Sequence, residues 1–351
     1  MPYRPRLQPD FMNLKTLASH LGISPSTVSR VLSGRGDAFR ISKKTQDRIL
    51  SKARSLGVRP NEVARSLRLS TSHTIGLVIP DISNPFFASL ARAVEREARK
   101  RGYTVLLADS QESLSGETEC VRMLTDRQID GLILAPVGGH AGHLKSLLSG
   151  PMPVVQVDRA LTQLRTPSVV ADNFSGARDA VRHLVSRGHR RIACVQGRED
   201  SSVIVERVRG YREGLKEAGL RFRKNWLVGG EHSMQVARDA TLALLRDSAA
   251  PTALLALSNQ LALGALQAAR ESGVSVPERL SIITFDEQPW ASLLSPPLMT
   301  IAQPVELMGV AAVDRLVDLV EKPTRRKIGP AVVKLPVKLI ERGSVGAVGI
   351  L

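Results

Sequence analysis

LKTLASHLGISPSTVSRVLSG, residues 14–34, contains two short apolar patterns separated by a glycine. The spacing of leucine and alanine in the first eight residues predicts an amphipathic helix that ends at Gly22. Ser24 and Pro25 are a natural N-cap and first residue for a second helix, which we expect to run to about Ser33. Two helices joined by a tight, glycine-containing turn form a helix-turn-helix. The stretch therefore predicts a small helical domain.

The second helix of this stretch has two unlike faces. Val28 and Val31 are spaced to face inward against the first helix. The opposite face carries proline, serine and arginine side chains. Serine hydroxyls can meet bases or phosphates, arginine can pair with both acceptors of guanine, and proline offers apolar surface to a thymine methyl group. This face predicts a contact with the major groove of DNA, and an ordinary helical hairpin is the alternative.

The charge of the chain is unevenly distributed. Residues 1–70 hold 14 Lys and Arg against 4 Asp and Glu, a net charge of +10 out of +16 for the whole chain. A basic block attached to a milder remainder is the electrostatic footprint of nucleic-acid binding, although a solvated tail has the same composition. The charge therefore supports the DNA-binding interpretation of the helix-turn-helix.

The rest of the chain changes character at Thr74. Before it, Ser42 is placed to cap a third helix that Gly57 ends, and residues 59–73 are typical of a short helical piece and a linker. After it, apolar strands such as TIGLVIP and LSIITFD alternate with amphipathic helices. This alternation predicts parallel sheets covered by helices, and the length suits two lobes better than one. We expect a small all-α headpiece and an α/β core with two lobes.

Several classes of protein are disfavoured. No apolar run reaches the roughly 18 residues that span a bilayer, and the first residues lack the apolar segment of a secretory leader. Two cysteines make no disulfide framework. Phosphate-binding loops, dinucleotide fingerprints and zinc-binding motifs are missing from the sequence. We therefore expect a cytoplasmic protein that is not an enzyme and needs no cofactor or metal.

Four other side chains have ordinary structural interpretations. His140 and His143, in GGHAGH, are expected to lie in a solvated loop. His189 precedes the apolar run RIACV and Cys194 lies within it, and both side chains are expected to be packed in the interior.

Three ordered blocks of the sequence carry a resemblance. LKTLASHLGISPSTVSRVLSG resembles the headpiece of the LacI/GalR (lactose-repressor) family, and RPNEVARSL is similar to the hinge of that family. SHTIGLVIPDISNPFFASLARAVEREARKRGYTVLLADS resembles the start of its effector-binding core, which is like the periplasmic sugar-binding proteins. The match continues through QIDGLILAP, VVQVDR, ERVRGY and FDEQPWASLLSPPLMTIAQP to about residue 342.

The resemblance implies a division of the chain into five parts. They are an N-terminal tail (1–12), a helix-turn-helix domain (13–60), a hinge helix and linker (61–72), a two-lobed effector-binding and dimerisation core (73–343), and a C-terminal tail (344–351). The tail after Arg342 has no heptad pattern, so we expect no coiled coil there.

The resemblance also implies DNA-binding residues. The positions that match the major-groove readers are Pro25, Ser26 and Arg30, and those that match phosphate contacts are Thr27 and Ser29. In the hinge, the matching positions are Asn61, Ala64 and Leu67, where Asn61 would cap a helix and Leu67 would wedge into the minor groove. The loop GRGDAFRIS is longer than the family pattern, Ser33 stands where Asn is common, and Val58 replaces the usual aromatic residue.

Polar and aromatic residues follow the expected strands of the core, where open α/β lobes bind ligands. By resemblance they form a sugar-type pocket, because rings and fixed polar groups suit polyhydroxylated ligands. The expected effector-binding residues are Asn84, Phe86, Phe87, Asp158, Arg159, Arg207, Ser258, Asp286, Trp290 and Gln303. Ser258–Asn259 replaces the usual Asn–Asp pair, with Ser258 expected to face the ligand. Arg159 and Arg207 leave room for a sugar acid; a capped strand end or a salt bridge is the structural alternative at each position.

We therefore expect a transcriptional regulator. Its expected mode of action is that of a homodimeric repressor that binds a near-palindromic operator in double-stranded DNA. A small sugar or sugar acid would release it by shifting the equilibrium between two arrangements of the lobes. A regulator that uses its ligand as a corepressor is a variant. A solute-binding protein of a transport system is the alternative from another class, although it has no use for a basic headpiece. An enzyme is a third possibility, but the sequence shows no activated nucleophile, set of metal ligands or cofactor-binding loop.

Overall fold

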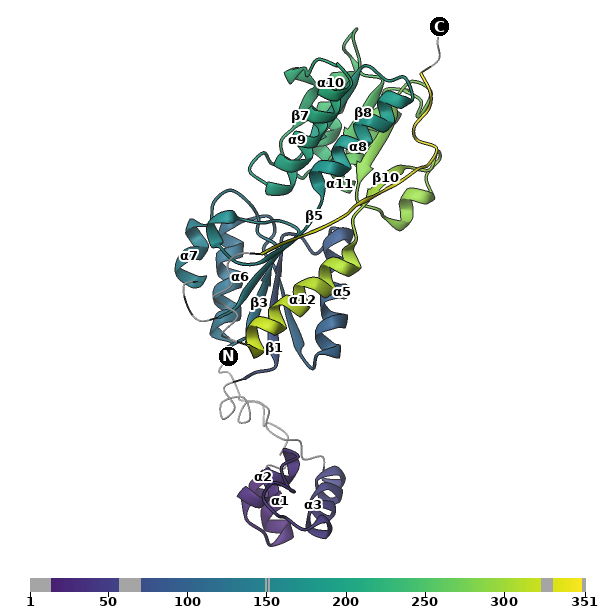
Figure 1. Ribbon diagram of the computed structural model, residues 1–351. Helices are drawn as coiled ribbons and strands as arrows, with labels where there is room; N and C mark the ends of the chain where they lie inside the picture. Colours follow the sequence, from purple (N-terminus) through teal and green to yellow (C-terminus); the bar gives the residue numbers. More distant parts are fainter. Residues whose placement is uncertain (1–13, 57–70, 149, 151, 323–330, 349–351) are drawn as a thin grey trace, which may run out of the picture. The chain divides into compact units, whose positions relative to one another are not determined.

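The computed structural model describes residues 14–56, 71–148, 150, 152–322 and 331–348, and the hinge residues Asn61, Ala64 and Leu67 lie outside these ranges. The chain forms two compact units, Met1–Ser72 and His73–Leu351 (Figure 1). Each unit is described by itself.

The first unit contains a headpiece of three helices (residues 14–56). The helices are α1 (Leu14–Leu21), α2 (Pro25–Leu32) and α3 (Lys43–Ser55). The expected N-caps are in place, since Ser24 accepts a hydrogen bond from the Thr27 amide at 3.2 Å and Ser42 accepts one from the Thr45 amide at 3.3 Å. The core of the headpiece is aliphatic and consists of Leu17, Ala18, Leu21, Val28, Val31, Ile49 and Ala53.

The second unit, the core, contains two lobes, each built on a six-stranded sheet. The sheet of the first lobe has the order β11-β5-β4-β3-β1-β2, and all its pairings are parallel. Its strands are β1 (Thr74–Ile79), β2 (Thr104–Asp109), β3 (Gly131–Leu134), β4 (Val154–Val157), β5 (Ser168–Ala171) and β11 (Val332–Leu335). Two separate apolar clusters flank the sheet, one under α5 (Pro85–Lys100) and α12 (Val305–Glu321), the other under α6 (Leu114–Asp126) and α7 (Gly142–Leu148).

The sheet of the second lobe has the order β12-β10-β9-β8-β6-β7 and is parallel except for the β10–β12 pair. Its strands are β6 (Ile192–Gln196), β7 (Leu227–Gly229), β8 (Ala253–Ala256), β9 (Ser281–Phe285), β10 (Met299–Ala302) and β12 (Lys338–Ile340). Its helices pack in two pairs, α8 (Asn173–Ser186) with α9 (Ser202–Glu217), and α10 (Met234–Leu245) with α11 (Asn259–Glu271). The prediction of a helical headpiece and a two-lobed parallel α/β core is confirmed.

The chain crosses between the lobes three times. It leaves the first lobe after β5, returns after β10 to form α12 and β11, and crosses again to β12. In Figure 1, α12 lies beside α5, and the final segment (yellow) runs past both sheets. Both lobes therefore depend on the C-terminal part of the chain.

One expectation about the core is wrong. His143 lies within α7 and is largely buried, and its Nε2 is 2.7 Å from Oε1 of the fully buried Glu117. A buried carboxylate requires such partners, so His143 packs against α6 and does not lie in a solvated loop. His140 is exposed in the loop that precedes α7, as expected. His189 and Cys194 are buried as expected.

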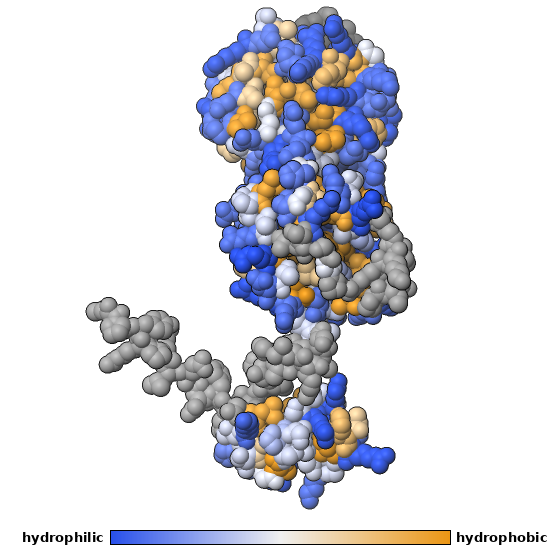
Figure 2. Space-filling view, turned by 90° about the vertical axis from the view of Figure 1, so that its left-hand side faces the viewer, coloured by the Kyte–Doolittle hydropathy of each residue, from blue (hydrophilic) through white to orange (hydrophobic). Residues whose placement is uncertain are grey.

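The surface of the core is mixed. In Figure 2, hydrophilic and apolar side chains alternate in patches on one face of both lobes. Among the described residues, no helix is both long and apolar enough to cross a membrane.

Candidate functional sites

The exposed face of α2 carries the residues expected to contact DNA. Pro25, Ser26 and Arg30 are exposed, and Thr27 and Ser29 are half-buried. The inward positions of the same helix are taken by valines that are at most 3% exposed. The helix therefore presents a continuous polar strip that the headpiece core does not use.

The first lobe places Asn84 and two aromatic rings at the end of β1. Asn84 caps α5, and its Oδ1 accepts hydrogen bonds from the Phe86 amide at 3.0 Å and from Nδ2 of Asn259 at 2.9 Å. The Phe86 and Phe87 rings meet edge to face, with their centroids 5.1 Å apart. Both rings belong to the core of the lobe, so they support the site as well as border it.

Asp158 and Arg159 follow β4 and are both buried. Arg159 donates two hydrogen bonds to the Glu112 carboxylate, at 2.8 and 2.7 Å, and a third to the carbonyl of Val137 at 3.0 Å. Burial opposes ionisation of Glu112, but these hydrogen bonds with Arg159 hold its pKa below the ordinary value. Arg159 is therefore already paired with a carboxylate before any ligand binds.

Asp158 differs from Glu112 because no hydrogen bond compensates for its burial to the same extent. Burial raises its pKa to about 6, against the opposing effect of Arg159 and Arg207. Its backbone φ is +63°, a left-handed conformation that Asp tolerates better than most residues. This conformation turns the chain sharply where β4 ends.

In the second lobe, Arg207 occupies the second turn of α9. Its Nε donates to Oδ1 of Asn173 at 2.7 Å, and its Nη1 donates to the carbonyl of Leu257 at 2.6 Å. The guanidinium lies over the Phe285 ring, 3.8 Å from its centroid. Burial lowers the pKa of Arg207, although Asp286 and Asp158 oppose this effect. These contacts fix the position of the Arg207 guanidinium.

Asp286 follows β9 and organises its neighbours. Its carboxylate accepts hydrogen bonds from Nε2 of Gln303 at 2.7 Å and from the amide of Asn259 at 3.3 Å. The donor of Asn259 is its backbone N–H. The side-chain oxygens of the same two residues, Oε1 of Gln303 and Oδ1 of Asn259, are buried and have no hydrogen-bond partner in the described structure. A buried acceptor without a partner is costly, so these two atoms favour a donor supplied by a ligand.

The described contacts of Ser258 and Trp290 lie within the second lobe. The Ser258 hydroxyl accepts a hydrogen bond from the Leu261 amide at 3.4 Å and caps α11, which leaves its proton and one lone pair for other partners. Trp290 lies half-buried in the short helix η3 (Pro289–Ser292) and packs against the core of the second lobe.

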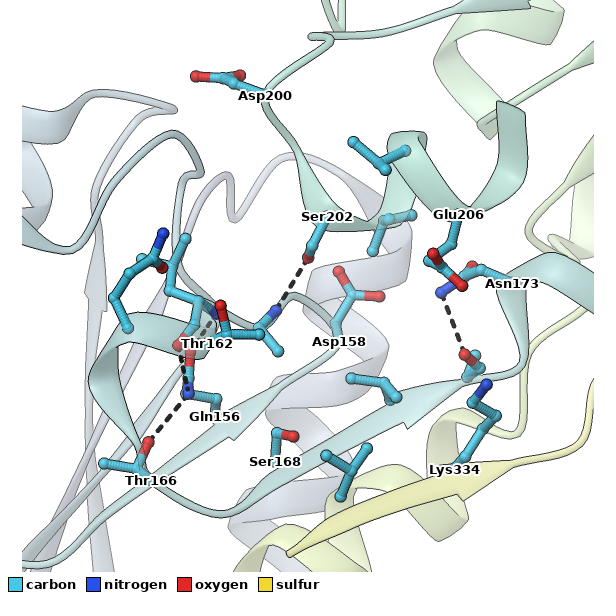
Figure 3. Close-up of a pocket in the computed structure, with 18 of the residues that line it drawn as sticks. Gln156, Asp158, Thr162, Thr166, Ser168, Asn173, Asp200, Ser202, Glu206 and Lys334 are labelled. Carbon is cyan, nitrogen blue, oxygen red and sulfur yellow. Dashed lines mark hydrogen bonds between the residues drawn. The ribbon is translucent and has the colours of Figure 1, made fainter. Parts of the chain in front are cut away.

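The core contains two cavities, and of the expected effector-binding residues only Asp158 lines one of them. One of about 540 Å³ is lined by both lobes, and Figure 3 shows the Asp158 carboxylate at its centre, with Ser202 and Glu206 on one side and Ser168 and Lys334 on the other. The second, of about 700 Å³, is lined by residues that include Glu112, Arg198 and His232. We call the region that contains both cavities and the buried polar residues between them the cleft.

Four residues of the cleft do not follow from the sequence interpretation: Glu112, Asn173, His232 and Asn259. Burial lowers the pKa of His232 to about 4, with a further contribution from Arg159, and its Nε2 has no hydrogen-bond partner in the described structure. Each of the four follows a strand, β2, β5, β7 or β8. A place shortly after a strand is therefore the signal that could have identified these residues in the sequence, although two residues separate Glu112, His232 and Asn259 from their strands.

The described residues contain no group of three or more His, Cys, Asp or Glu side chains placed to hold a metal ion. The cleft is instead a set of hydrogen-bonding groups on two lobes. Asn84 and Asn259 join the lobes directly, and the amide of Ala160 donates to the Ser202 hydroxyl at 3.0 Å.

Known proteins share the sequence and the fold. Residues 72–343 match the family model described as periplasmic binding proteins and sugar binding domain of LacI family. The chain is 32% identical to catabolite control protein A of Priestia megaterium, over 93% of this chain and 97% of that protein.

Two solved structures are similar over all or most of their length. The lac repressor dimer bound to operator and the anti-inducer ONPF is matched over 95% of this chain and 99% of that chain, with 26% identity and a TM-score of 0.84. A LacI family regulator from Enterococcus faecium with bound ribose is matched over 79% of this chain and 100% of that chain, with 29% identity and a TM-score of 0.69. The chain therefore belongs to the LacI family and is a DNA-binding transcriptional regulator with that family's two-lobed sugar-binding type of core.

Proposed function

We propose that the protein is a homodimeric repressor whose affinity for a near-palindromic operator is controlled by a small neutral sugar bound in the cleft. The observation that carries the proposal is the pair of buried, unpartnered acceptors on Gln303 and Asn259 beside the Asp286 carboxylate. Sugar hydroxyls supply donors to such acceptors, and the Phe87 and Phe285 rings border the same region.

The charges of the cleft favour a neutral effector over a sugar acid. Three carboxylates, those of Glu112, Asp158 and Asp286, face two buried arginines, and Arg159 is already paired with Glu112. An added anion would lie beside a surplus of negative charge in a region of low dielectric. The sugar-acid alternative rested on Arg159 and Arg207 being free to bind an anion, and the pairing of Arg159 with Glu112 removes half of that support.

The proposed DNA contacts are those of α2 and the hinge. Pro25, Ser26 and Arg30 would meet base edges, and Thr27 and Ser29 would meet phosphates. The proposed hinge contacts, Asn61, Ala64 and Leu67, lie outside the described residues. A protein that acts on DNA in this way belongs in the bacterial cytoplasm, which is the location we propose.

Control of DNA binding would operate through the contacts that join the lobes. In addition to the bonds of Asn84 and Ser202, the amide of Gly139 donates to the carbonyl of Asp200 at 3.2 Å. A sugar that hydrogen-bonds both lobes would favour one arrangement of the lobes over another. In a homodimer, the change would alter how two headpieces are presented to two half-sites.

The test is a thermal-unfolding screen of the full chain against ribose and cellobiose, with gluconate as the sugar acid. A neutral sugar present at 100 times its Kd should add about 2.7 kcal/mol to the free energy of unfolding and raise the melting temperature. The same sugar should fail to stabilise the Asp286→Asn variant. Stabilisation by gluconate alone, or by no sugar in a panel widened to pentoses, hexoses and disaccharides, would contradict the proposal.

A sugar that binds is then added to the protein on an operator isolated from a random duplex library. Release from the operator is the expected result for an inducer. Tighter operator binding would instead establish a corepressor, with the same cleft and the opposite direction of control.

A further inference from the structure

The loop between α2 and α3 places an aromatic ring on the arginine expected to read DNA. Phe39 is 46% exposed, and the guanidinium carbon of Arg30 lies 4.1 Å from the centroid of its ring. Phe39 belongs to the stretch that makes this loop longer than the family pattern.

The loop is fixed at both of its ends. The Arg35 amide donates to the carbonyl of Arg30 at 2.8 Å, and the Phe39 amide donates to the carbonyl of Arg35 at 3.2 Å. These two bonds tie the first half of the loop, and the backbone of Phe39, to the last turn of α2. The position of the ring follows from the backbone that carries it.

The second half of the loop is tied to α3. Asp37 accepts hydrogen bonds from Nε2 of Gln46 at 2.8 Å and from Nζ of Lys43 at 3.0 Å. The same Nε2 also donates to the carbonyl of Ile41 at 2.7 Å. A side chain on Gly36 would collide with Gln46, because its Cβ would lie 2.3 Å from that amide carbon. A larger residue at this position would therefore require the Gln46 side chain, and its hydrogen bonds to the loop, to move.

The ring has no evident role in stabilising the headpiece. Phe39 is absent from the apolar cluster that forms the headpiece core and from the partly buried residues packed against it. Within the described residues, no acidic side chain is paired with Arg30, so the ring is its one recorded side-chain partner.

We propose that Phe39 is a positioning residue that determines specificity by holding Arg30 ready to pair with guanine. The inference rests on the proposed role of Arg30 as a base reader. A stacked ring covers one face of the planar guanidinium and leaves the N–H groups in its plane free for the O6 and N7 acceptors of guanine. Because the arginine is already restricted, less conformational freedom is lost when it binds.

The test measures base preference with the full-length protein and a library of duplexes randomised over the binding site. The variants are Phe39→Ala, Phe39→Tyr and Arg30→Ala. The matched control is Phe174→Ala, which removes a ring 4.6 Å from a guanidinium of the core, that of Arg209. Thermal unfolding of each variant reports whether the fold is intact.

Arg30→Ala should abolish the preference for guanine at one position of each half-site. Phe39→Ala should weaken that same preference about two- to fivefold, the range expected for an exposed cation–π contact. Phe39→Tyr should retain it because the ring face is kept, and Phe174→Ala should leave the base preferences unchanged. A double variant that combines Arg30→Ala with Phe39→Ala should have the same base preferences as Arg30→Ala alone, since the action of Phe39 depends on Arg30.

The outcomes separate the two proposals. If Arg30→Ala reduces the guanine preference and Phe39→Ala does not, Phe39 has no positioning role, while the base-reading role of Arg30 stands. If Phe39→Ala sharpens the preference, the ring holds Arg30 away from the bases, and the inference is overturned. If Arg30→Ala leaves every base preference unchanged, the reading role of Arg30 itself fails, and the role of Phe39 fails with it.

Discussion

Asp158 and Asp286 occupy corresponding places in the two lobes. Each directly follows a strand, each is buried, and each has a positive φ, +63° and +74°. Non-glycine residues in this conformation carry a backbone cost of order 1–3 kcal/mol, which persists only where the surroundings impose it. The two carboxylates are thus placed in the cleft at the expense of stability, as is common for binding sites.

The raised pKa of Asp158 predicts a particular dependence of stability on pH. A carboxyl whose pKa rises from 3.8 to about 6 on folding binds more protons in the folded state, so its ionisation lowers stability as pH rises through this window. The Asp158→Asn variant cannot ionise at this position. Its stability relative to the wild type should therefore increase from pH 4 to pH 6.5, as measured by urea unfolding at several pH values.

The comparison with the variant isolates Asp158, because the other titrating groups are common to both proteins. Glu112 and His232 have shifts of opposite consequence in the same region, and their effects cancel in the difference. A difference in stability that does not change with pH would show that Asp158 is not protonated on folding.

At the residue scale, the sequence revealed the ends of strands better than the partners of side chains. Asp158, Asp286 and Gln303 follow apolar runs whose ends are legible in the sequence. The bond between Asn84 and Asn259 joins residues 175 positions apart. Such a contact depends on how two lobes pack, which no local pattern records. The pairing of Glu112 with Arg159 was not predicted because it, too, joins residues far apart in the sequence.

At the element scale, the N-caps of the headpiece were legible because a cap is a local interaction. Ser24→Ala removes an acceptor from the first turn of α2 and should lower the stability of the headpiece by about 1 kcal/mol. Thermal unfolding followed by circular dichroism measures the change. Ser51→Ala, at an exposed position within α3, is the control and should change stability by less than about 0.5 kcal/mol. Equal effects of the two variants would show that the cap contributes nothing.

Helix α7 illustrates where local patterns fail. GGHAGH, with its glycines, has the composition of a loop, yet His143 lies in a helix and pairs with Glu117 of α6. The pairing satisfies a carboxylate that is 0% exposed, and Glu117 also accepts a hydrogen bond from the Val137 amide at 2.7 Å. Tertiary contact, and not helix propensity, accounts for this element.

At the scale of the whole molecule, the bond between Asn84 and Asn259 should restrain the lobes. Asn259→Ala removes this bond, and a loss of about 1 kcal/mol corresponds to about fivefold more frequent local opening. We expect amide hydrogen exchange about fivefold faster in the first turns of α5 and α11 and unchanged in α1–α3. Asn225→Ala, an exposed substitution in the second lobe, is the control. Unchanged exchange in α5 would show that the bond does not hold the lobes together.

The alternation of strands and helices was sufficient to predict two parallel lobes, but not their connections. A pattern of this kind gives the order of elements along the chain and leaves open which sheet each element joins. Helix α12 follows a strand of the second lobe and yet packs on α5 of the first. Its apolar face fits either lobe, so the assignment depends on the three-dimensional packing.

The return of the chain to the first lobe has a consequence for synthesis. The headpiece is complete once residue 56 has left the ribosome, whereas the first lobe lacks its edge strand until residue 335 has followed. A translation product that stops between these points has all three helices of the headpiece and an incomplete core. Such a fragment keeps the face of α2 that we propose contacts DNA, and it lacks the complete cleft that we propose controls the contact.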